Sequence, residues 1–209
     1  MSDMNGQKSI FLNNHCKKKN ISYLSFDFRG HGKSSGDFED FGIGDWFNDL
    51  KKLIKYLNIQ KTIIVGSSMG GWVAMLYALN FPKQVSKLIG IAPAPDFTRD
   101  LIWKELTTLE KHKIKTNKIV VRRINKDFSY SYSPKLFINS KKFFIGDIKK
   151  KYNGETILFH GGKDLIVPYN YNDRFYKNSN FLNLTNITIK NADHSMSDKF
   201  SLKSIAKYI

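Results

Sequence analysis

Residues 66–70 read GSSMG, which matches the G-x-S-x-G pattern that presents a nucleophilic serine. This segment follows a short apolar run at 62–65 and opens an apolar helical pattern at 69–80, so its serine lies in a turn between a strand and a helix. The glycines leave room for the turn, where larger side chains would collide. The N-terminal end of the helix favours negative charge, as on an oxyanion. The context predicts Ser68 as a catalytic nucleophile.

A serine hydroxyl needs a base to take its proton and an acid to orient that base. Asp164 follows the apolar run at 156–159, and His194 follows the run at 187–189. Loops at the carboxyl ends of parallel strands meet in one crevice, so both side chains can converge on Ser68. We therefore predict Asp164 as the acid and His194 as the base.

Other titratable side chains compete for these roles. Asp193 is the alternative acid because it is adjacent to His194, although the glycine-rich turn at 161–164 is better suited to present a carboxylate. The remaining histidines lie in turn, strand-end, helical or insertion contexts without a partner pattern: His15, His31, His112 and His160. The sequence has no H-E-x-x-H pattern, cysteine cluster or G-x-G-x-x-G fingerprint, so we expect neither a metal nor a cofactor.

The elements that must position these residues alternate between strands and helices. Short β-branched or aromatic runs predict strands, and apolar residues at helical spacing predict helices. Such alternation is typical of the α/β class, with a mostly parallel sheet covered by helices on both faces. We expect residues 1–209 to form one domain. The predicted strands are 21–28, 62–65, 87–92, 156–159 and 187–189, and the predicted helices are 43–57, 69–80 and 202–209.

Residues 96–151 break this alternation and predict a lid or cap inserted between strands of the sheet. The insertion carries 15 Lys and Arg against 6 Asp and Glu, a net charge of +9. If it covers the site, this charge would attract anionic small-molecule or acylated substrates.

The whole chain of 209 residues has a formal net charge of +16. Lysine supplies 29 of the 34 positive residues, and codon composition explains that abundance as well as an anionic partner does. Arginine-rich runs are absent, so we expect no nucleic-acid partner. The one cysteine, Cys16, permits no internal disulfide, and no signal segment or membrane-spanning run is seen; we expect a cytoplasmic protein without a transmembrane segment.

Several segments together resemble the α/β-hydrolase fold family. They are 2–6 (SDMNG), 26–36 (FDFRGHGKSSG), 66–72 (GSSMGGW), 160–168 (HGGKDLIVP) and 192–197 (ADHSMS). They are most similar to the branch that holds the mitochondrial palmitoyl-protein thioesterase, which also cleaves acyl glucuronides, and its bacterial relatives. The chain order Ser68, Asp164, His194 is also that of this family.

The resemblance implies a serine hydrolase for carboxylic esters or thioesters that works through an acyl-enzyme. Ser68 would be the nucleophile, Asp164 the acid and His194 the base, and the backbone N–H of Met69 would hold the oxyanion. A peptidase or amidase of the same fold is the alternative, since the same triad cleaves amides.

In this family a segment such as 2–6 follows a strand and a turn that donates a second oxyanion N–H. We therefore expect that second donor upstream of Met1, and N-terminal strands that are missing, with a gap between 21–28 and 62–65. A truncated, catalytically impaired hydrolase that acts as a binding protein remains a further alternative.

Overall fold

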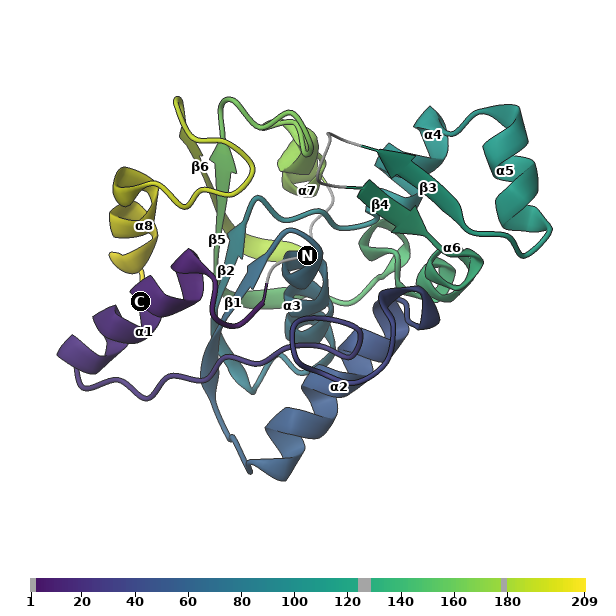
Figure 1. Ribbon diagram of the computed structural model, residues 1–209. Helices are drawn as coiled ribbons and strands as arrows, with labels where there is room; N and C mark the ends of the chain where they lie inside the picture. The colour runs from purple at the N-terminus through teal and green to yellow at the C-terminus, as the bar shows by residue number, and fades with distance from the viewer. Residues whose placement is uncertain (1–2, 124–128, 178–179) are drawn as a thin grey trace.

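A computed structural model describes residues 3–123, 129–177 and 180–209. A four-stranded sheet forms its centre, and every neighbouring pair in it is parallel (Figure 1). The fold is therefore of the predicted α/β class. In spatial order the strands are β1 (Thr62–Ser67), β2 (Val85–Ile91), β5 (Tyr152–Gly161) and β6 (Phe181–Ile189).

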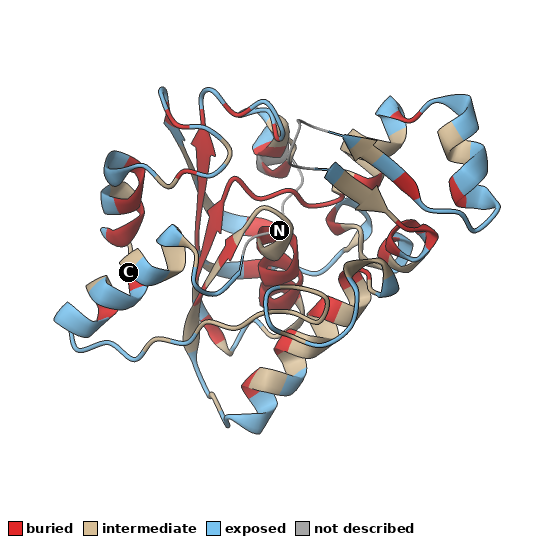
Figure 2. Cartoon of the chain, viewed as in Figure 1, coloured by how far each residue is buried: buried red, intermediate tan, exposed pale blue. Residues whose placement is uncertain are grey.

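Helices cover both faces of the sheet (Figure 1). On one face lie α2 (Ile43–Tyr56) and α3 (Met69–Asn80), and on the other lie α1 (Gln7–Lys18) and α8 (Lys199–Ala206). Successive strand residues point to opposite faces, so Leu88 packs in one apolar cluster and Ile89 in the other. Figure 2 shows this burial as red along the strands and α3.

The predicted helices at 43–57 and 69–80 are confirmed as α2 and α3, and the closing helix as α8. The strands at 62–65, 87–92, 156–159 and 187–189 are confirmed as β1, β2, β5 and β6. Both β5 and β6 begin earlier than predicted. The prediction missed their first halves because exposed polar residues such as Asn153 and Asn183 interrupt the apolar runs there.

The predicted strand at 21–28 is wrong, because the structure contains no strand over these residues. A strand needs a ladder partner, and β1 pairs with β2 alone among the described strands. The aromatic residues of the segment make other contacts instead. The Phe26 and Phe28 rings pack edge to face, and the Tyr23 hydroxyl hydrogen-bonds to Ser9 on α1.

The described residues of the insertion, 96–123 and 129–151, lie beside the sheet and have their own small apolar core of Leu106, Ile114, Val120 and Phe137 (Figure 1). Its elements are a π-helical turn (Thr98–Ile102), α4 (Trp103–Glu105), α5 (Thr108–Lys115), an antiparallel pair β3 (Val120–Arg123) and β4 (Ser129–Tyr132), α6 (Pro134–Ser140) and 3-10 turns at Lys141–Phe143 and Ile145–Asp147. Elsewhere, short helical turns occur at Phe38–Asp40, Tyr171–Asp173 and α7 (Arg174–Lys177).

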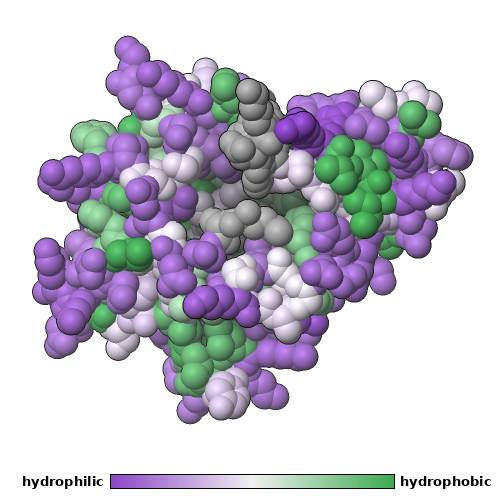
Figure 3. Space-filling model, viewed as in Figure 1, coloured by the Kyte–Doolittle hydropathy of each residue, from purple (hydrophilic) through white to green (hydrophobic). Residues whose placement is uncertain are grey.

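Among the residues described, no helix is both long and apolar enough to cross a membrane. The face shown in Figure 3 is mostly hydrophilic, with separate hydrophobic patches.

A buried carboxylate joins the two ends of the inserted segment. Asp96 is fully buried, and its two oxygens accept hydrogen bonds from the backbone N–H of Ile145 at 2.6 Å and of Gly146 at 3.0 Å. Arg99 lies 3.2 Å from the same carboxylate. Burial raises the pKa of Asp96, although these hydrogen bonds and the neighbouring arginines oppose the shift.

Arg174 extends this connection to α7. Its guanidinium donates to the carbonyl of Pro95 at 2.8 Å and pairs with Asp100. The start of the insertion is therefore fastened both to its end and to the chain that follows β5.

We predict that Asp96→Ala lowers the free energy of unfolding by about 2–4 kcal/mol, because it leaves the N–H groups of Ile145 and Gly146 without their acceptor. Asp147→Ala is the matched control: this aspartate also pairs with Arg99, but its side chain is 64% exposed, so its loss should cost less than about 1 kcal/mol. Urea unfolding measures both. Equal losses in the two variants would contradict the role assigned to Asp96.

Candidate active site

Ser68 lies in a sharp turn between β1 and α3. Its backbone has φ 53° and ψ −120°, a conformation that costs a non-glycine residue about 1–3 kcal/mol. The turn is held by hydrogen bonds from the Ser68 N–H to the Ile91 carbonyl at 2.9 Å and from the Ala94 N–H to the Ser68 carbonyl at 3.1 Å. The backbone of the next strand therefore fixes the position of the serine.

The two glycines of the motif differ in their surroundings. A Cβ atom at Gly66 would lie 2.3 Å from the carbonyl oxygen of Gly70 and 2.8 Å from Ala74. A Cβ at Gly70 would meet no atom within 4 Å. The expected collision is therefore confirmed at Gly66 and wrong at Gly70. Gly71, just beyond the motif, is the second crowded position, because its Cβ would lie 2.6 Å from Pro93.

His194 joins the predicted nucleophile to the predicted acid. Its Nε2 lies 3.0 Å from the Ser68 hydroxyl, and its Nδ1 lies 2.7 Å from an oxygen of Asp164. The Asp164 side chain is 1% exposed and that of His194 19%. The structure therefore brings the three predicted residues into one hydrogen-bonded line.

Asp164 is held in its ionised form by donors on both oxygens. One oxygen faces His194, and the other accepts the backbone N–H groups of Ile166 and Val167, each at 2.8 Å. Burial alone would raise the pKa of Asp164, but the hydrogen bonds from His194, Val167 and Ile166 outweigh it and hold the pKa below its usual value. These two backbone donors could not be predicted from the sequence, because backbone groups have no residue signature.

The loops after β5 and β6 touch through their backbones. Gly162 donates to the Ile189 carbonyl and Lys163 to the Ala192 carbonyl, each at 2.9 Å. A Cβ at Gly161 would lie 2.4 Å from the carbonyl of Asp193, so only glycine permits this approach. The close contact sets Asp164 beside His194.

The side chains of the alternative acid, Asp193, and of the other histidines make no described hydrogen bond to the line of Ser68, His194 and Asp164. Asp193 accepts the N–H groups of Ser195 and Met196 at 2.9 and 3.0 Å, which shapes the loop rather than the imidazole. His15 and His112 lie on α1 and α5. His31 packs edge to face with Phe38 and Trp46, and His160 is buried on β5; burial lowers the pKa of both imidazoles.

Met69 is the first residue of α3, where backbone N–H groups have no acceptor within the helix. This position suits the predicted oxyanion donor. The second donor, expected upstream of Met1, lies outside the residues described. Within those residues no cluster of three or more His, Cys, Asp or Glu could hold a metal ion.

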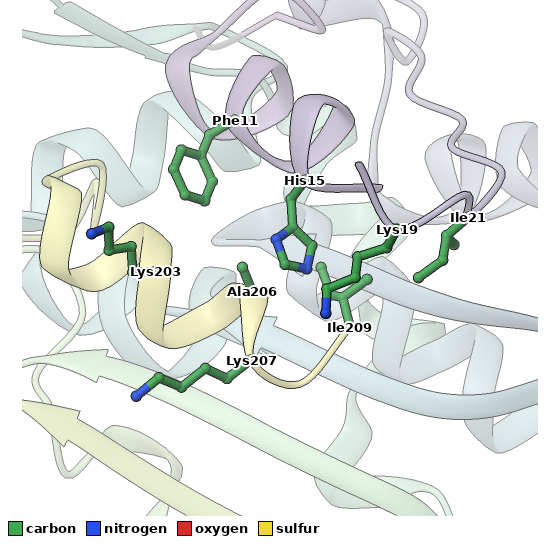
Figure 4. A pocket seen from close by; sticks show the side chains of 8 residues that line it. All are labelled: Phe11, His15, Lys19, Ile21, Lys203, Ala206, Lys207 and Ile209. Carbon is green, nitrogen blue, oxygen red and sulfur yellow. The ribbon is translucent and has the colours of Figure 1, made fainter. Parts of the chain in front are cut away.

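A cavity of about 580 Å³ opens between α1 and α8 (Figure 4). Ser68, Asp164 and His194 do not line it. The side chains of Lys203 and Lys207 extend away from those of His15 and Lys19 in this view, so the four basic groups do not converge on one point.

Comparison with known proteins identifies the class. The family model of the alpha/beta hydrolase fold matches residues 4–108, half of the chain, and the chain belongs to this family. The predicted resemblance is thereby confirmed, and the protein is a hydrolase.

Within this family, the chain is similar to several individual proteins. The chain is 26% identical over 204 residues to bovine palmitoyl-protein thioesterase ABHD10, mitochondrial, an alignment that covers 97% of this chain and 67% of that protein. It therefore spans about two thirds of the relative's length. A putative hydrolase from Agrobacterium vitis S4 matches with a TM-score of 0.91 at 25% identity, over 99% of this chain and 82% of that one. Mouse ABHD10 shares the fold, with a TM-score of 0.88 at 24% identity over 99% and 83%.

Gly66 is crowded and Gly70 has open space, so alanine should have different effects at the two positions. Gly66→Ala should lower the free energy of unfolding by about 1–3 kcal/mol, because the new methyl group meets backbone that cannot move without disturbing the turn. Gly70→Ala should leave it unchanged or raise it by up to about 1 kcal/mol, since alanine favours the helix and has open space. Urea unfolding compares them. Equal destabilisation by the two substitutions would refute the steric assignment.

Proposed function

We propose that this hydrolase cleaves carboxylic esters or thioesters through an acyl-enzyme formed on Ser68. The observation that carries the proposal is the unbroken line of hydrogen bonds from the Ser68 hydroxyl through His194 to Asp164. An isolated serine hydroxyl is a weak nucleophile, and a base at 3.0 Å with its own orienting carboxylate is the arrangement that activates it.

Acylation begins when the Ser68 hydroxyl oxygen bonds to the substrate carbonyl carbon and its proton passes to His194 Nε2. Asp164 stays ionised, because its pKa is held low, and stabilises the imidazolium through Nδ1–H. The Met69 N–H donates to the carbonyl oxygen as it becomes negative. The proton on Nε2 then moves to the departing alcohol or thiol, and the acyl group stays on Ser68.

Deacylation uses the same residues, with water in place of the serine as the attacking group. His194 Nε2 takes a proton from a water molecule whose oxygen attacks the acyl carbon. Collapse of the intermediate breaks the bond to Ser68, the imidazolium returns its proton to the serine, and a carboxylic acid leaves. The histidine therefore acts first as base and then as acid in each half of the cycle.

Similarity to proteins named as thioesterases supports acyl thioesters as substrates. Residues 96–151 would form the lid over the acyl group, fastened at its base by Asp96. The net charge of +9 in this segment favours acyl donors that carry negative charge.

We predict that Ser68→Ala abolishes covalent labelling by a fluorophosphonate probe and hydrolysis of an acyl thioester, because the attacking oxygen is removed. Ser67→Ala is the matched control, since it removes a hydroxyl one position away in the same motif, at the end of β1. It should retain labelling. In-gel fluorescence and a thiol-release assay provide the two readouts.

Persistent labelling of Ser68→Ala would place the nucleophile elsewhere. Turnover of aminoacyl amides that exceeds turnover of acyl thioesters would replace the proposed substrate class by the peptidase or amidase class.

A further inference from the structure

The loop that carries His194 contains a residue with a strained backbone two positions further along the chain. Met196 has φ 48°, in the left-handed region that side-chain-bearing residues rarely adopt. Its side chain is fully buried in the apolar cluster that also contains Leu12 and Ile205. The Met196 backbone is therefore held in an unfavourable conformation while its side chain is fixed in the core.

The peptide group between Ser195 and Met196 is bound at both ends. Its N–H donates to the carboxylate of Asp193 at 3.0 Å. Its carbonyl accepts hydrogen bonds from the ammonium of Lys8, on α1, at 2.6 Å and from the Ser197 hydroxyl at 3.2 Å. Lys8 is half-buried, and 187 residues separate it from Ser195 in the chain.

Rotation of this peptide group by half a turn would carry φ of Met196 from 48° to a negative value, the usual sign for a residue with a side chain. The buried Met196 side chain and the hydrogen bonds that such a rotation would break therefore hold the observed orientation. A hydrogen bond from an ammonium is stronger than one between neutral groups, such as that from the Ser197 hydroxyl. Lys8 thus opposes the release of strain in the loop.

We propose that Lys8 is a positioning residue, which locks the Ser195–Met196 peptide and thereby keeps His194 in line with Ser68 and Asp164. The assignment of a catalytic effect rests on the proposed function. Lys8 itself does not touch the triad side chains in the contacts described; it acts through the backbone next to His194.

The test compares Lys8→Met with Lys17→Met, which removes an exposed lysine from the same helix. The first readout is the second-order rate of Ser68 labelling by a fluorophosphonate, at a temperature where both variants are folded by circular dichroism. The second is the proton NMR signal of His194 Nδ1–H, shifted to low field by its bond to Asp164 and assigned by its absence from His194→Ala. Should Lys8→Met fail to fold, Lys8→Gln is read in the same way, because glutamine is uncharged and reaches one bond less far.

We expect the labelling rate of Lys8→Met to fall by about tenfold or more, since small displacements of a catalytic group have effects of this size. The low-field proton signal should broaden or disappear in this variant and stay unchanged in Lys17→Met. An unchanged rate together with an unchanged signal would overturn the proposal, and so would equal effects in the two variants. If the wild-type chain is not labelled on Ser68, the proposed function fails, while the NMR comparison still decides whether Lys8 positions His194.

Discussion

The hydrogen bond from the Ser68 hydroxyl to His194 depends on a backbone constraint at Ser68 itself. The serine is held at φ 53° between a strand and a helix, and the carbonyl of Ile91 on the neighbouring strand fixes its amide. This turn places the hydroxyl at the carboxyl edge of the sheet, where the loops after β5 and β6 also begin. The strain of one residue is offset by the ladder between β1 and β2 and by the buried helix behind it.

Close backbone approach is the second physical requirement of the site. Gly161 and Gly162 lie against the carbonyls of the loop that bears His194, and Gly66 lies against Gly70 at the turn of the nucleophile. Each contact places two polypeptide segments nearer than a side chain would permit. Two apolar clusters, one on each face of the sheet, keep the strands in register so that these contacts coincide. The site is thus assembled from backbone packing and completed by three side chains.

Much of this arrangement could be predicted from the residues. The helix at 69–80 is an almost unbroken apolar run after a glycine turn, and it is buried on nearly all sides as such a run requires. Asp164 could be preferred to Asp193 because a glycine-rich turn precedes it. The strand predicted at 21–28 was wrong because aromatic and β-branched residues indicate burial, while a strand also needs a ladder partner.

Other features had no signal in the sequence. Lys8 is one of 29 lysines, and nothing in its neighbourhood marks it as a contact of a loop 187 residues away. Asp96 looks like any turn aspartate until the fold buries it between the two ends of an insertion. Backbone donors such as those on Asp164 depend on loop conformation alone.

Trapping of the acyl-enzyme tests the central claim most directly. The chain is mixed with an acyl thioester, quenched in acid within the first turnover, digested and analysed by peptide mass spectrometry. The account predicts one acyl group on Ser68, which accumulates more slowly when Asp164 is replaced by asparagine. An acyl group on another residue, such as Cys16, or hydrolysis without any adduct on Ser68 would contradict it.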